Sequence, residues 1–197
     1  MDLAENMTRQ AGSPVLVMVF YEALCPDSKN FIVKQLHSAY TRAPSLIDIQ
    51  FVPYGKATTI VNDDGSLSFE CQHQQIECEA NIYHACAIEA IQDQKIALNM
   101  IVCMIKDNIP PKDVMISCAK ENHIDYEAIQ KCYDTPHGRE LLKLHGEATD
   151  ALRPKVKFIP TITLDGSQGR QASILKDLFG EVCKVAAGHG PMPLECQ

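Results

Sequence analysis

The sequence predicts a mixed α/β fold in which a long helical region interrupts the sheet-forming parts of the chain. Three observations predict it: a strand–helix–strand pattern near the N-terminus, helical periodicity through the middle, and a return of strand character before a last helix. At 197 residues the chain is long enough for one buried core with an insertion but short for two independent domains. We therefore expect one compact unit.

The first unit begins with the apolar run 15–21 (VLVMVFY), which is too short for a buried helix and predicts a central strand. Apolar residues then recur at helical spacing over 31–40, and Pro26 suits the first turn of that helix. Residues 47–52 alternate apolar and polar before Pro53 and predict a second strand. A strand, a helix and a strand in this order form a right-handed parallel unit by default.

The middle of the chain predicts a hairpin followed by several helices. Two short apolar segments within 58–69 flank the turn sequence 62–65 (NDDG). From residue 77 to about 150 the apolar spacing is helical, and prolines divide the stretch.

Strand character returns at 156–159 and 161–164, on either side of Pro160. We expect a further short strand near 167–171 and a closing helix over 174–186. This order of elements is that of a thioredoxin-like core interrupted in its middle. The expected boundaries are 13–56 and 155–187 for the core, 57–154 for the hairpin and helical insertion, and 188–197 for a C-terminal tail pinned by a disulfide.

Composition and charge argue against two classes of partner. The formal net charge is −7, and no stretch gathers enough Lys and Arg to neutralise several phosphates, so we expect no nucleic-acid partner. No apolar run approaches the roughly 20 residues that a membrane span needs.

The nine cysteines indicate an oxidising compartment, where a chain uses them as disulfide staples. We therefore expect a protein of the secretory pathway. The sequon at Asn6 is a glycosylation candidate that fits this compartment. The first ten residues are charged and lack the apolar region of a signal peptide, so we expect a processed or recombinant mature form.

Cys25 is the candidate nucleophile, because it lies between the end of a predicted strand and the start of a predicted helix. Unpaired backbone N–H groups and the positive end of a helix favour a thiolate there. At about pH 5 a free thiol with a pKa of about 8.5 is only ~0.03% thiolate, so a useful nucleophile needs such stabilisation. The alternative for Cys25 is a buried small apolar residue or half of a structural disulfide.

A second group of residues carries a resemblance. Residues 71–86 (CQHQQIECEANIYHAC) resemble the signature of the gamma-interferon-inducible lysosomal thiol reductase family, Cys-Gln-His-Gly-x-x-Glu-Cys-x-x-Asn-x-x-x-x-Cys, with Gln74 in place of its glycine. The matching positions are Cys71, Gln72, His73, Glu77, Cys78, Asn81 and Cys86. With the Cys25 turn and the Ile159-Pro160 element, the resemblance covers most of the chain from about residue 15 to 196.

The resemblance implies a thioredoxin-like fold with a helical insertion, and reduction of protein disulfides in acidic endosomes and lysosomes or outside the cell. It also implies a Cys-x-x-Cys active site, which in this chain is Cys25-Pro26-Asp27-Ser28. A serine hydroxyl cannot resolve a mixed disulfide, which is the step of the second thiol in a dithiol cycle. Ser28 could still donate a hydrogen bond to the thiolate or cap the helix. An engineered exchange of cysteine for serine would leave the same sequence.

The resemblance further places a cis-proline, Pro160, beside the active cysteine, where the backbone of Ile159 would pair with an incoming peptide. The alternative is an ordinary edge-strand proline. Cysteines and histidines within 71–86 could suggest zinc, but their spacing lacks the paired short loops of structural zinc sites. We expect no metal and no cofactor.

Because the cysteine count is odd, one thiol must stay free, pair with another chain or carry a small-molecule cap, and Cys25 is the natural one. The other eight would form four disulfides. Cys183–Cys196 is the favoured pair, since it would pin the tail and stabilise by about 3 kcal/mol in the chain-entropy model. Cys118–Cys132 is a second candidate, and the pairing of the remaining four stays open.

We therefore predict a thiol–disulfide oxidoreductase that acts on disulfide-containing proteins through the single nucleophile Cys25 and is poor at turnover without an external small thiol. The alternative is a non-enzymatic secreted binding protein on the same scaffold. The natural substrate and the oligomeric state stay open.

Overall fold

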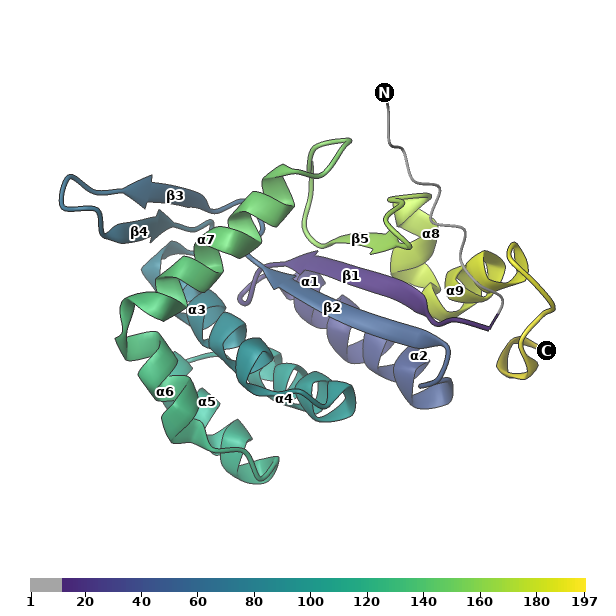
Figure 1. The fold of residues 1–197 in the computed structure, drawn as a ribbon, viewed down its shortest axis with the longest axis horizontal. Coiled ribbons are helices and arrows are strands. Elements are labelled where there is room, and N and C mark those ends of the chain that lie inside the picture. The colour runs from purple at the N-terminus through teal and green to yellow at the C-terminus, as the bar shows by residue number, and fades with distance from the viewer. Residues whose placement is uncertain (1–11) are drawn as a thin grey trace.

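The computed structural model describes residues 12–197, and the glycosylation candidate Asn6 lies outside them. Figure 1 shows a mixed α/β fold in which helix α3 lies beside β2 and helix α8 beside β5, the two outer strands of the sheet. The expected α/β class with a largely helical insertion is confirmed. The elements in chain order are β1 (Val15–Tyr21), α1 (Pro26–Asn30), the π-helical segment η1 (Phe31–Leu36), α2 (His37–Arg42), β2 (Ile47–Pro53), β3 (Thr58–Val61), β4 (Leu67–Glu70), α3 (Gln74–Ala90), α4 (Gln94–Lys106), α5 (Pro111–Glu121), α6 (Tyr126–Asp134), α7 (Pro136–Asp150), β5 (Thr161–Leu164), α8 (Gln171–Lys176), α9 (Leu178–Ala187) and the short 3-10 helix η2 (Leu194–Cys196).

Strand β1 is the centre of a three-stranded sheet of order β2-β1-β5. It pairs in parallel with β2 along its whole length and antiparallel with β5, with Phe20 opposite Thr161. Because β5 runs the other way, its first residue lies beside the last residues of β1. The segment before Thr161 is thereby brought next to the loop that follows β1, although the two are far apart in sequence.

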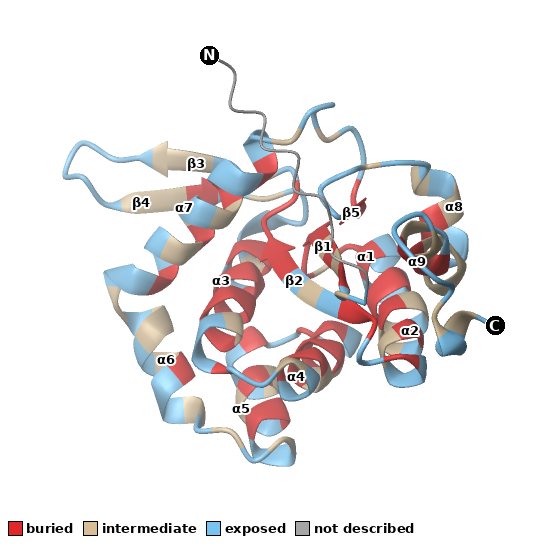
Figure 2. Ribbon diagram, turned by 45° about the vertical axis from the view of Figure 1, so that its right-hand side comes forward, coloured by how far each residue is buried: buried red, intermediate tan, exposed pale blue. Residues whose placement is uncertain are grey.

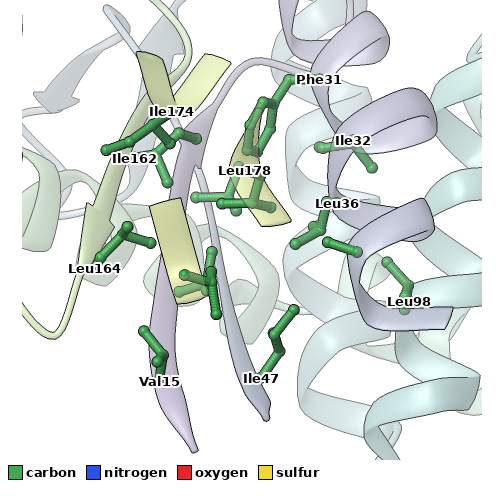
Figure 3. Close-up of a cluster of buried hydrophobic side chains, with 14 of the residues drawn as sticks. Val15, Phe31, Ile32, Leu36, Ile47, Leu98, Ile162, Leu164, Ile174 and Leu178 are labelled. Carbon is green, nitrogen blue, oxygen red and sulfur yellow. The ribbon is translucent and has the colours of Figure 1, made fainter. Parts of the chain in front are cut away.

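The helical crossover from β1 to β2 covers one face of this sheet. Its apolar residues Phe31, Ile32 and Leu36 are buried against the strands and against α4, α8 and α9 (Figure 3). The apolar run of β1 and the helical spacing after it therefore form one core, because both bury their apolar positions in the same layer.

A second apolar cluster fills the helical region, with α3 at its centre (Figure 2). Helix α4 contributes to both clusters: Leu98 and Ile101 pack in the first, and Met100 and Met104 in the second. The boundaries at 57 and 154 stay a prediction, since this helix joins the two clusters.

Four disulfides crosslink the described residues, and Cys25 is the free cysteine. Cys183 and Cys196, the pair that the sequence favours, are joined. The other bonds are Cys71–Cys78, Cys86–Cys132 and Cys103–Cys118.

The second candidate pair, Cys118–Cys132, is wrong. Cys118 on α5 is bonded to Cys103 on α4, and Cys132 on α6 is bonded to Cys86 on α3. Each of these helices packs against an earlier helix, and the disulfides follow that packing.

Three expected elements near the C-terminus also differ. Residues 156–159 form no strand, because β1 ends at Tyr21 and leaves nothing for them to pair with. The short strand near 167–171 is reduced to one bridge between Leu164 and Ser167. The closing helix is split at Asp177, whose side chain accepts a hydrogen bond from Gly180 N and starts a new helix.

No helix within residues 12–197 has the length and apolar character to cross a membrane.

Candidate active site

Cys25 occupies the junction between β1 and α1. It is the N-cap residue of α1, with extended backbone angles, and Pro26 and Asp27 form the first turn. The carbonyl of Cys25 accepts the first helical hydrogen bond, from Lys29 N at 3.0 Å. The residue is buried, with 8% of its surface exposed. The strand end and helix start predicted from the sequence therefore do meet at this cysteine.

Ser28 lies one helical turn beyond Cys25 and is fully buried. Its Oγ accepts a hydrogen bond from the backbone N of Glu22 at 3.3 Å. The helix start has no side-chain cap, so the capping role that the sequence allowed for Ser28 is absent here. The serine hydroxyl is instead part of the hydrogen bonding inside the loop between β1 and α1.

The segment before β5 approaches the thiol from the other side. The Ile159–Pro160 peptide bond is cis, and the backbone oxygen of Ile159 lies 3.8 Å from Cys25 Sγ. Phe158, one residue earlier, is 46% exposed. The structure thus places Ile159 and Pro160 beside the cysteine, and their role in substrate pairing stays a prediction.

A cleft of about 250 Å³ opens beside Cys25. It lies between the loop that carries the cysteine and the end of α4 with the segment that follows it. Charged and apolar side chains share its wall, namely Lys29, Lys106, Asp107 and Ile109. The surface next to Cys25 is therefore formed partly by the helical region.

The signature residues lie next to the same loop. Helix α3 begins with Gln74 and carries Glu77 and Asn81, both fully buried. Glu77 Oε2 accepts a hydrogen bond from Leu24 N at 3.2 Å, and Asn81 Oδ1 accepts one from Ala23 N at 2.9 Å. Sequence reasoning treated the signature and the Cys25 turn as separate groups, and the structure joins the signature to the two residues before Cys25 by hydrogen bonds.

A further series of buried polar side chains also contacts this loop. Asn108 Nδ2 donates to the carbonyl of Ala23 at 2.6 Å, and Asn108 Oδ1 lies 2.9 Å from His84 Nε2. His84 Nδ1 in turn lies 2.7 Å from the hydroxyl of Tyr21. Complete burial lowers the pKa of His84 to about 4 and raises that of Tyr21 well above its usual value.

Sequence reasoning did not find Asn108 or Tyr21. Asn108 is one polar residue in the segment after a predicted helix, and Tyr21 is the last residue of an apolar strand. His84 entered only as a possible zinc ligand. Its two hydrogen-bond partners come from distant segments, and no periodicity indicates such contacts.

A cluster of one histidine and two carboxylates lies behind the loop. His73 Nδ1 is 2.6 Å from Glu77 Oε2 and 3.5 Å from Glu22 Oε2. Burial is the main cause that raises the pKa of Glu22, and the nearby Glu77 carboxylate adds to it; the Lys56 backbone N–H, at 2.9 Å, acts the other way. Gln72, with its amide nitrogen turned to donate, lies 2.9 and 3.1 Å from the Glu22 oxygens.

These groups also form a candidate set of metal ligands. One ligand atom each from Glu22, His73 and Glu77 lie within 4.8 Å of one another. Their oxygens already accept hydrogen bonds from protein N–H groups, including His73 N at 3.1 Å from Glu77 Oε1. The contacts that are present thus describe a hydrogen-bonded support for the loop.

Gln74, where the family signature has glycine, has a φ of 68°. This is the left-handed region, which costs a residue with a side chain about 1–2 kcal/mol. A Gln74→Gly variant is therefore expected to gain about 0.5–1 kcal/mol in the free energy of unfolding, because that strain exceeds the entropy that glycine adds to the unfolded chain. Urea denaturation of both proteins measures the difference.

Glu79→Gly is the matched control, since Glu79 is an exposed residue inside the same helix. It is expected to lose about 1 kcal/mol. Equal losses in the two variants would show that the left-handed backbone at position 74 carries no strain.

Comparisons with known proteins agree with this geometry. A family model described as gamma interferon inducible lysosomal thiol reductase matches residues 16–134. GILT-like protein 1 of Drosophila melanogaster is 31% identical over 96% of this chain and 81% of its own length. The gamma-interferon-inducible lysosomal thiol reductase of Carassius auratus is 30% identical over 95% of this chain and 74% of its own length.

Among solved structures, Chlamydia trachomatis DsbA superposes with a TM-score of 0.60 over 95% of this chain and 93% of that protein, at 12% identity. At that identity the likeness shows the fold alone, which is thioredoxin-like.

Proposed function

The chain belongs to the gamma-interferon-inducible lysosomal thiol reductase family, and we propose that it acts on protein disulfides through the single nucleophilic thiol of Cys25. Its fold is that of thioredoxin-like oxidoreductases. The observation that carries the proposal is the place of Cys25, the one cysteine outside the four disulfides, at a helix start beside Ile159 and Pro160.

The proposed chemistry needs a thiol from outside the chain. Cys25 Sγ attacks one sulfur of the substrate disulfide, so that a mixed disulfide forms and the other substrate sulfur leaves as a thiolate that takes up a proton. Ser28 cannot attack the mixed disulfide. An external small thiol must release the substrate, and a second one must reduce the disulfide left on Cys25, so that two small thiols are oxidised for each protein disulfide reduced.

The test is covalent capture. Incubation with a disulfide-containing protein, without a small thiol, should yield a mixed disulfide visible as a mass increase under non-reducing conditions. Cys25→Ser should yield none, and a small thiol should release the captured protein. If alkylation shows that Cys25 is reactive but no mixed disulfide forms, the proposed function is wrong.

A second candidate is a binding protein without redox turnover. The burial of both Cys25 and Ser28 favours it, because each is packed into the scaffold. In that case Cys25→Ser should bind the same partner with unchanged affinity. The covalent capture experiment therefore separates the two functions.

We also propose that the protein works in the secretory pathway, in endosomes and lysosomes or outside the cell, and carries a glycan at Asn6. The four disulfides and the family support the compartment. Protein made in a secreting eukaryotic cell should lose mass on endoglycosidase treatment, and Asn6→Gln should not.

A further inference from the structure

The loop between β1 and α1 has its backbone held by side chains from elsewhere in the chain. Ala23 N donates to Asn81 and Leu24 N donates to Glu77, while the carbonyl of Ala23 accepts from Asn108. These residues lie after the end of the strand and before the start of the helix. Their backbone groups therefore have no partners in the regular hydrogen bonding of the sheet or the helix. Buried N–H and C=O groups need a partner, and here the helical region supplies all three.

The three side chains are themselves buried. Glu77 and Asn81 are fully buried on α3, and Asn108 is 4% exposed. Asn81 and Glu77 are four residues apart on one helix, so they present their oxygens to consecutive backbone N–H groups of the loop. The loop position is therefore tied to the position of α3.

The carbonyl of Ala23 fixes the orientation of the Asn108 amide, and Asn108 in turn fixes the tautomer of His84. Because Asn108 must donate its amide nitrogen to Ala23, its oxygen faces His84 Nε2, which must then carry the proton. His84 Nδ1 is left as an acceptor for the hydroxyl of Tyr21. With a neutral imidazole, each of the hydrogen bonds that link Asn108, His84 and Tyr21 has one donor and one acceptor. This agrees with the lowered pKa of His84.

We propose that Glu77, Asn81, His84 and Asn108 form a loop clamp, whose members are positioning residues that hold the backbone before Cys25 and so aim its thiol at the substrate disulfide. The inference rests on the proposed function and gives a physical role to two signature positions, Glu77 and Asn81. Glu77, Asn81 and Asn108 act through residues 23–24, and His84 acts through Asn108. Asn108 also lines the cleft beside Cys25, whereas Asn81 does not, so Asn81→Ala is the cleaner variant.

The test compares the rate of mixed-disulfide formation between folded variants and the parent protein. Asn81→Ala and Asn108→Ala should form the mixed disulfide with a protein substrate about 10 to 100 times more slowly, because a displacement of about 1 Å is enough to cost that much. Thr149→Val is the matched control. It removes a buried hydrogen bond, from Thr149 Oγ1 to the carbonyl of His145 at 2.8 Å, without touching the loop. Its rate should stay within about twofold of the parent.

A second measurement uses a small aromatic disulfide reagent, which can approach the thiol from any direction. Its rate separates an effect on the position of the thiol from an effect on its intrinsic reactivity. Clamp variants should lose much less rate with this reagent than with the protein substrate. Equal losses with both, or wild-type rates in folded variants, would overturn the proposal. So would an equal loss in Thr149→Val, since burial alone would then explain the effect.

Hydrogen exchange on the unmodified protein keeps the proposal testable if the variants do not fold. The amides of Ala23 and Leu24 should be protected to the same degree as the central amides of α3. Exchange at unprotected rates would contradict the clamp. This measurement does not depend on redox activity, so it can fail while covalent capture succeeds, and the reverse.

Discussion

Ser28→Cys is expected to turn slow, thiol-dependent chemistry into multiple-turnover disulfide reduction, with a gain of at least about tenfold and a fall in trapped mixed disulfide. The introduced thiol would lie one helical turn from Cys25 at nearly the same volume as the buried hydroxyl it replaces. It could attack the mixed disulfide without leaving the site. The measurement is the rate of protein disulfide reduction with a catalytic amount of enzyme.

Two control variants show whether the gain in Ser28→Cys comes from the introduced thiol. Ser28→Ala removes the hydroxyl, and with it the hydrogen bond from Glu22 N, without adding a thiol, so it should show no gain. Cys25→Ser should abolish both reduction and capture. If Ser28→Cys folds, links the introduced thiol to Cys25 on oxidation and still reduces nothing, the reductase function fails and the binding function takes its place.

Removal of the Cys86–Cys132 disulfide is expected to cause a large loss of stability. The bond joins α3 to α6 across 46 residues and closes a loop that contains α4 and α5. In the chain-entropy model a loop of this length is worth about 4 kcal/mol, somewhat less because Cys103–Cys118 already shortens it. The double variant Cys86→Ala/Cys132→Ala should therefore melt roughly 10 °C lower.

The Cys71–Cys78 disulfide supplies the comparison, because it spans only 7 residues. Its removal in Cys71→Ala/Cys78→Ala should cost about 2.5 kcal/mol by the same model. Thermal unfolding of both double variants under identical conditions measures the order. A larger loss from the short loop would show that local contacts at the signature, rather than chain entropy, dominate.

The sequence was sufficient for the elements that local patterns specify. The apolar run of β1, the helical spacing after Pro26 and the alternation in β2 each bury one face, and the structure contains all three. The signature 71–86 was enough to identify the family. The odd number of cysteines pointed to one free thiol, and the free one is Cys25.

The errors have a common cause. The pair Cys118–Cys132, the strand at 156–159 and the unbroken last helix were all predicted without knowledge of the tertiary contacts. Each outcome instead depends on which distant element packs there, such as α3 against α6 or the length of β1 beside β5.

By itself the sequence determined the α/β class, the family and the position of Cys25 at a strand end and helix start, because these depend on residue order and short-range spacing. Only the tertiary structure decided what surrounds that cysteine. The contacts of Glu77 and Asn81 with the loop, and of Asn108 with Ala23, join residues 53 to 85 positions apart. Such contacts form because buried backbone groups must find partners, and folding brings only particular side chains within reach.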